Sequence, residues 1–247
     1  MQKTRISMAT IGHMPINFEV GKVAKWKSSL FEVVGNIESY SLNINSDGDD
    51  WEYTDSALSQ RLPVSGAGEF MIAIVNVRLE LNWYTRGLDN NRVVFTFHEI
   101  QEILNLNNIP LENVIYRLLY AYTFAYRSHG NRIPRADERA SFAHDETKGC
   151  LFDMNGLKSD IVHSCHKPII CPECVAKLRQ NRVSHNAIQS AQRDIQKIQK
   201  PLFYRMSGFI KRHPVWSIVI SSVAAIVLGT IGSIIGSCIY EAVRNGT

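Results

Sequence analysis

Two cysteines in the stretch CHKPIICPEC, residues 165–174, have the spacing of half a zinc site. Cys171 and Cys174 form C-x-x-C between a short apolar run and a helical pattern, an arrangement that points two thiolates at one ion. Zinc in a structural site takes four protein ligands, so two more side chains must come from elsewhere in the chain. We expect Cys150 and His144, which lie near a glycine turn, to complete the set.

Two nearer side chains, Cys165 and His163, are alternates for the remaining ligands. With four protein ligands the zinc would be structural, because thiolate-rich zinc is a weak Lewis acid and keeps no open position for water or substrate. A thioredoxin-type redox role for C-P-E-C is disfavoured by the histidine and cysteine residues crowded beside it, which favour a metal instead.

The cysteine count and the net charge exclude some protein classes. Five cysteines in 247 residues are too few for a disulfide scaffold, and four of them lie between positions 150 and 174, which favours a metal site in a reducing compartment. The formal charge of +4 comes from 27 basic and 23 acidic residues, so we expect no direct nucleic-acid binding. The N-terminus has no signal-peptide pattern, which predicts a cytosolic location for the soluble part.

A run without any charged residue covers positions 215–240. About 20 residues of helix cross a hydrocarbon core of about 30 Å, so the sequence predicts one transmembrane helix, over 214–243. Six basic residues lie between positions 193 and 212, before the run, whereas Arg244 is the one that follows it. The positive-inside rule then predicts a single-pass, tail-anchored membrane protein with its N-terminal side in the cytoplasm and the lipid bilayer as a partner.

Small residues recur inside the apolar run. Gly232 and Gly236 form G-x-x-x-G, and Gly229 lies one turn earlier. Glycines at this spacing let helix backbones approach closely in lipid, which predicts a homo-oligomer. The alternative is that these glycines have no such role, since glycine is frequent in membrane helices.

Two amphipathic stretches occupy residues 183–213. Between 202 and 210 the apolar residues repeat at helical spacing, with basic residues elsewhere, a pattern typical of a helix in the headgroup region. One continuous membrane-proximal helix is the alternative. Farther upstream, four apolar residues at intervals of three and four predict a short helical stalk: Ile188, Ala191, Ile195 and Ile198.

The first 182 residues mix strand and helix patterns, without an internal repeat. Strands are predicted at 6–12, 39–44, 69–83 and 92–97, and helical spacing recurs at 18–34, 98–104 and 111–128. The acidic stretch 45–68 is predicted to be a long loop with one helical turn. This mixture predicts an α/β (α+β) cytosolic domain over 1–182 that includes a zinc knuckle at 144–174.

The order of these elements is similar to that of the archaemetzincin-like zinc metallopeptidases. The strands FMIAIVNVRLELNW and RVVFTF, a long helix, and the segments HDETKGCLFDMNG and IICPECVAKL carry the resemblance, which covers residues 68–182. It implies that Cys150, Cys171 and Cys174 are structural zinc ligands and that Met154 is a relic of the family's methionine turn.

The chain departs from this family where catalysis would occur. The family's catalytic helix carries H-E-x-x-H, whereas its counterpart NVIYRLLYAYTFAYR, at 113–127, has neither histidine nor glutamate, so no catalytic zinc can be assembled there. Asn155 also stands about where the family's second cysteine falls. The resemblance therefore implies a pseudopeptidase scaffold without catalytic residues.

Three functions agree with these features. The first is a non-enzymatic membrane effector, whose zinc-stabilised domain binds a cytosolic protein partner encoded nearby and drives oligomerisation or membrane disruption. By analogy with small anchored bacterial proteins, its setting would be anti-phage defence. The alternative is a membrane-tethered zinc metallopeptidase with an atypical site around His98, Glu99 and His144. The third is an adaptor that only brings a partner to the membrane.

Overall fold

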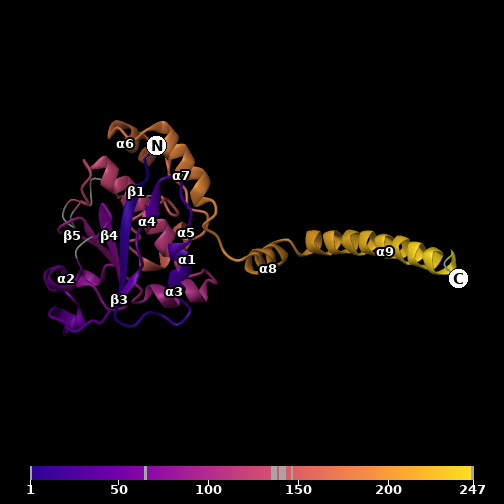
Figure 1. Cartoon of the computed structure of the whole chain (residues 1–247), viewed down its shortest axis with the longest axis horizontal. Helices are drawn as coiled ribbons and strands as arrows, with labels where there is room; N and C mark the ends of the chain where they lie inside the picture. The colour runs from indigo at the N-terminus through magenta and orange to yellow at the C-terminus, as the bar shows by residue number, and fades with distance from the viewer. Residues whose placement is uncertain (1, 64–65, 135–137, 139–142, 146, 246–247) are drawn as a thin grey trace. The chain divides into compact units, whose positions relative to one another are not determined.

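The structure, a computed structural model, describes residues 2–63, 66–134, 138, 143–145 and 147–245. The chain forms two compact units, Met1–Lys200 and Pro201–Thr247. The first unit contains a sheet with helices on both faces, and the second contains the helices α8 (Leu202–Arg212) and α9 (Pro214–Asn245) (Figure 1).

Six strands pair in one sheet within the described part of the first unit. Their order is β2-β1-β4-β6-β5, and β3 also pairs with β1. All pairs are parallel except β5 with β6, which is antiparallel and lies at one edge. The strands are β1 (Thr4–Ile11), β2 (Phe31–Val33), β3 (Glu38–Tyr40), β4 (Phe70–Val75), β5 (Thr85–Leu88) and β6 (Arg92–Thr96).

Helices connect and cover these strands, which confirms the predicted mixed α/β class. Short 3-10 turns lie at Asp49–Trp51, Glu80–Asn82 and Lys158–Asp160. The helices of the first unit are α1 (Val20–Ala24), α2 (Asp55–Arg61), α3 (Ile100–Leu106), α4 (Glu112–Ser128), α5 (Ile161–Ser164), α6 (Pro172–Gln180) and α7 (His185–Ile195).

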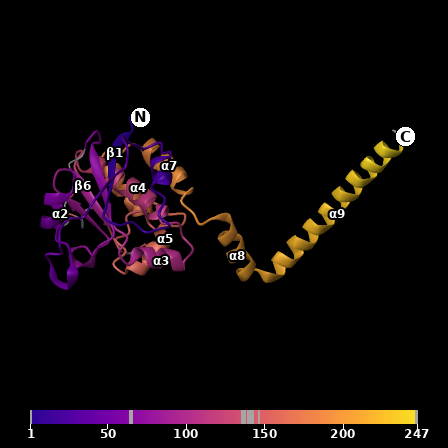
Figure 2. The ribbon, with the colours of Figure 1, turned by 60° about the horizontal axis from the view of Figure 1, so that its bottom comes forward.

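The central strand β4 is buried along its whole length because both faces of the sheet are covered. Phe70 and Ile74 belong to the larger hydrophobic core, which includes α4, whereas Ala73 and Val75 pack with Leu58 of α2 in a smaller core. Successive side chains of a strand point to opposite faces, so one apolar strand serves both cores. Figure 2 shows α2 and α4 on opposite sides of the strands.

The helix α4 is the central helical element of the first unit, and every residue from 112 to 126 is buried. A helix that is buried all round must lie between two layers. Accordingly, α4 contacts β2 of the sheet as well as α1, α5 and α7. The long buried helix predicted at 111–128 is confirmed.

The strand predicted over 69–83 is shorter in the structure and ends at Val75. The chain turns after it, and Leu81 and Asn82 adopt left-handed backbone conformations, with φ of 55° and 52°. The carboxylate of Glu52 accepts hydrogen bonds from both of their N–H groups, at 2.8 and 3.0 Å, and holds this turn. Glu52 lies in the acidic stretch that is predicted to be a loop. Its carboxylate stabilises a distant turn, which the composition of the stretch did not indicate.

The stretch 18–34 forms the short helix α1 followed by the strand β2, instead of one helix. Phe31 is buried and pairs with Thr4 in the parallel ladder between β2 and β1. The spacing of apolar residues in this stretch fits a helix locally, but pairing with β1 decides the conformation of its second half.

The second unit contains the apolar run. Within α9, the stretch Pro214–Ser237 contains an 18-residue window that has a mean hydropathy of 2.4 and is not buried. By length and composition this helix can cross a membrane. The structure has two helices here instead of one continuous helix, because His213, between α8 and α9, has non-helical backbone angles, φ −133° and ψ 63°.

The apolar stripe predicted to form a stalk lies in the core of the first unit. Ile188, Ala191, Ile195 and Ile198 are all at most 1% exposed, and α7 contacts α4. The Asp194 carboxylate also accepts hydrogen bonds from the backbone N–H and the hydroxyl of Ser29, at 2.9 and 2.8 Å. This corrects the expectation of a free stalk over these residues, because the stripe is covered by the domain itself.

Replacing Ile195 with alanine tests the position of α7. The side chain is fully buried, so Ile195→Ala should lower the free energy of unfolding by about 2 to 5 kcal/mol. Ile210→Ala, in the exposed helix α8, is the matched control and should change it by less than about 0.5 kcal/mol. Urea unfolding of the detergent-solubilised chain measures both, and equal small effects would place α7 outside the core.

Candidate metal centre

Two chain segments bring the candidate ligands together. Cys171 is the N-cap residue of α6, and Cys174 lies in the first turn of that helix. Pro172 occupies the first helical position, where its fixed φ suits a helix start and its missing N–H is not needed. The backbone N–H of Cys174 donates to Cys171 Sγ at 3.4 Å, so the helix start itself orients the first thiol.

The other segment, which carries His144 and Cys150, lies between α4 and α5. Leu151 donates its N–H to the Ile169 carbonyl at 2.7 Å, and Ile169 donates to the Gly149 carbonyl at 3.0 Å, so this segment is tied to the residues just before α6. Gly149 has a φ of +84°, which favours glycine, and a Cβ there would come within 3.3 Å of the His163 carbonyl. The turn thus requires glycine.

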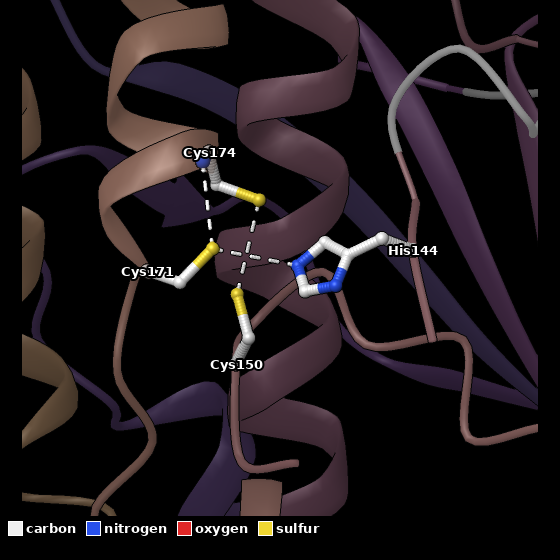
Figure 3. A group of neighbouring side chains, drawn as sticks. All are labelled: His144, Cys150, Cys171 and Cys174. Atoms are coloured by element: carbon white, nitrogen blue, oxygen red, sulfur yellow. Dashed lines mark hydrogen bonds between the residues drawn. The ribbon is translucent and has the colours of Figure 1, made fainter. Parts of the chain in front are cut away.

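The four side chains meet at one point (Figure 3). Their ligand atoms all lie within 4.8 Å of one another, and all four residues are buried. Cys150 Sγ lies 3.9 Å from Cys174 Sγ, and Cys171 Sγ lies 3.5 Å from His144 Nε2. In the described part of the chain this is the one group of three or more His, Cys, Asp or Glu side chains that could share an ion.

These distances fit zinc. A tetrahedral ion with bonds of about 2.3 Å to sulfur and about 2.0 Å to nitrogen needs about 3.8 Å between two sulfurs and about 3.5 Å between sulfur and nitrogen. The two measured edges, 3.9 and 3.5 Å, agree with this geometry. Three thiols and one imidazole are also the donor types that zinc prefers in structural sites. Bound there, the ion would join the two segments.

The electrostatics of the cluster favour an ionised sulfur. The hydrogen bond between the Cys150 and Cys174 thiols lowers the pKa of Cys150, and the same contact raises the pKa of Cys174. The thiolate is the form of cysteine that binds metals. His144 presents Nε2 to the sulfurs, while its buried Nδ1 has no hydrogen-bond partner among the described residues. The histidine is therefore oriented by the sulfurs and by its own backbone.

That backbone is held by a second pair of hydrogen bonds. The His144 N–H donates to the Phe152 carbonyl at 3.1 Å, and the Met154 N–H donates to the His144 carbonyl at 2.8 Å. The segment that follows Cys150 therefore folds back against His144. This pairing brings the His144 imidazole close to the Cys150 thiol, although the two residues are six positions apart in the sequence.

The two alternate ligands lie outside the cluster. Cys165 is the C-cap residue that follows α5, and its carbonyl accepts a hydrogen bond from Asn113 Nδ2 at 2.9 Å. Complete burial raises the pKa of the Cys165 thiol to about 12, which favours the neutral form. His163 is exposed on α5. The structure thus brings together His144, Cys150, Cys171 and Cys174 and leaves both alternates elsewhere.

Comparison with known proteins gives one structural likeness. No protein-family model matches the chain, and no curated protein matches it. The crystal structure of archaemetzincin from Methanopyrus kandleri superposes with a TM-score of 0.40 at 12% identity, over 73% of this chain and 96% of that one. Similarity this low assigns neither an activity nor a ligand to the chain.

The side chains of His98 and Glu99, which the metallopeptidase alternative places in an atypical site, make contacts of another kind. The Glu99 carboxylate accepts hydrogen bonds from Lys158 Nζ at 2.7 Å and from Asn82 Nδ2 at 3.2 Å. The bond from Lys158 lowers the pKa of Glu99, so this carboxylate is a poor proton acceptor. His98 Nε2 lies 3.8 Å from the same carboxylate, and neither residue belongs to the metal cluster.

A cavity of about 50 Å³ lies beside α4, and sequence reasoning did not find its main feature. Arg117 lines it and is only 2% exposed, and its guanidinium donates to Tyr84 Oη at 3.1 Å and to the Asp153 carbonyl. Asn155 Nδ2 donates to the same two oxygens. The available signal was an arginine in the middle of an apolar helical stretch, because such a charge is buried only with several polar partners.

Zinc content tests the assignment of ligands. We expect about one zinc per chain in the purified protein, near-complete loss in Cys171→Ser and in His144→Ala, and unchanged zinc in Cys165→Ser, because Cys165 lies outside the cluster. Plasma mass spectrometry measures the metal, and circular dichroism reports whether each variant folds. Zinc retained by Cys171→Ser but lost from Cys165→Ser would refute the assignment.

Proposed function

We propose that the chain is a single-pass membrane protein whose first unit is a zinc-stabilised recognition domain without catalytic activity. The closed set of four ligands carries this proposal. Three thiols and one imidazole satisfy a tetrahedral zinc ion and leave no position for water or substrate. An ion held in this way acts as a cross-link between two segments of the fold and not as a Lewis acid.

The surroundings of α4 support the absence of a second, catalytic metal. The buried helix carries neither H-E-x-x-H nor another pair of histidines, and the cavity beside it already contains the Arg117 guanidinium. A fixed positive charge in a low-dielectric site repels a divalent cation. The proposal therefore makes this domain pseudopeptidase-like, and its task is to bind a cytosolic protein.

Residue composition around α9 supports the membrane part of the proposal. The helix can cross a bilayer by length and composition. The basic residues that precede it support a first unit on the cytoplasmic side, by the positive-inside rule. Gly229, Gly232 and Gly236 recur at intervals of three and four, and a Cβ on any of them would meet no atom within 4 Å. This smooth stripe suits close packing against the same helix of another copy.

In this account, binding of a partner by the first unit promotes association of α9 helices and disrupts the membrane. The effector role, and its setting in bacterial anti-phage defence, rest on analogy with small anchored proteins. Activity would then depend on the glycine stripe as well as on the zinc centre. An adaptor, in contrast, would need α9 only as an anchor.

Substitutions in the stripe test this proposal. Induced expression of the chain, alone or beside the products of neighbouring genes, should collapse the membrane potential, and the double variant Gly232→Leu, Gly236→Leu should abolish the effect and the cross-linked oligomers. Val227→Leu is the matched control, because Val227 lies on the face of α9 opposite the three glycines and its substitution should leave both intact. Potential-sensitive dyes and cross-linking in membranes give the two readouts.

Two results would contradict the proposal. A membrane potential that is unchanged under every expression condition would exclude an effector that disrupts membranes. Full activity of the double glycine variant would show that α9 serves only as an anchor, as the adaptor function requires.

A further inference from the structure

The helix α8 has an exposed apolar face. None of its residues is buried, and five large apolar side chains are between 46% and 73% exposed. At about 100° per residue, these five lie within an arc of about 120° on the helix surface. They are Leu202, Phe203, Met206, Phe209 and Ile210.

The opposite face of α8 is cationic. Arg205, Lys211 and Arg212 lie outside the apolar arc, together with Tyr204, Ser207 and Gly208. The chain contains no aspartate or glutamate between Asp194 and Glu241. The positive charge of α8 therefore has no acidic neighbour along this stretch of sequence.

The helix α8 is a separate helical segment, although it belongs to the same compact unit as α9. Pro201 precedes it, and the non-helical His213 separates it from α9. An isolated helix of 11 residues is marginally stable in water, so α8 needs a surface that covers its apolar face.

The position of α8 in the chain indicates which surface this is. The apolar window of α9 begins at Pro214, two residues after the end of α8. Consecutive Cα atoms are about 3.8 Å apart, so once α9 enters a bilayer the end of α8 lies at the bilayer surface. An apolar face flanked by cations matches an interface with acyl chains below and acidic headgroups at the sides.

We infer that α8 is an interfacial helix that binds anionic lipid headgroups and so gives the protein a second, charge-dependent contact with the membrane that α9 enters. This inference rests on the proposed anchoring by α9, and it adds a preference for a lipid class. Attraction between basic side chains and an anionic surface weakens with salt, so binding by α8 should depend on ionic strength whereas anchoring by α9 should not.

Hydrogen exchange of the full chain in lipid nanodiscs tests this inference. The amides of residues 202–212 should exchange about tenfold or more slowly in discs that contain 30% phosphatidylglycerol than in pure phosphatidylcholine discs, and added salt should reverse the effect. The variant Arg205→Gln, Lys211→Gln, Arg212→Gln should remove the difference. A control that removes three exposed charges from the first unit, Lys3→Gln, Lys25→Gln, Lys27→Gln, should keep it.

Each other outcome has a separate meaning. Equal exchange in the two kinds of disc would overturn the preference for anionic lipid, and slow exchange in both would mean that a neutral surface or another copy covers α8. Failure of the chain to incorporate into either disc would contradict the anchoring by α9 instead, so the two proposals fail in distinguishable ways.

Discussion

Three sulfurs and one imidazole nitrogen converge within 4.8 Å of one another, and the C-terminal third of the first unit depends on this contact. It ties the segment that carries His144 and Cys150 to the start of α6. The chain then continues into α7, which packs on α4 and closes the main core. A tetrahedral ion would hold these parts in register, in addition to the backbone hydrogen bonds that already pair the two segments.

The sequence predicts this centre well because its signals are local. C-x-x-C at a helix start, with proline between the cysteines, and a glycine beside Cys150 each specify a turn. The same holds for α4, whose length and apolar composition predict burial. By contrast, two strands depend on partners that are distant in the sequence. The strand β2 forms because it pairs with β1. The strand β4 ends early because the Glu52 carboxylate holds the turn that follows it. Arg117 was missed because its partners come from separate segments.

Three successive helices show how similar local patterns lead to different environments. Both α7 and α8 are amphipathic, but the apolar stripe of α7 packs into the protein core and that of α8 is exposed. The helix α9 is apolar on all sides, a composition that suits contact with lipid and not with water. The spacing of apolar residues in α7 predicts an amphipathic helix but does not reveal which surface packs on its apolar stripe. The prediction of a stalk is therefore wrong. Hydrogen bonds from Ser29 to Asp194 are the kind of distant contact that decides this.

In the function that we propose, zinc is a saturated cross-link between two segments of the fold and not a reactive centre. X-ray absorption at the zinc edge of the purified, membrane-reconstituted chain tests it most directly. We expect three sulfur neighbours at about 2.3 Å and one nitrogen at about 2.0 Å, unchanged when peptides or chelating hydroxamates are added. A zinc ion with fewer sulfurs and an oxygen from water, or one whose ligands change when such compounds bind, would contradict it.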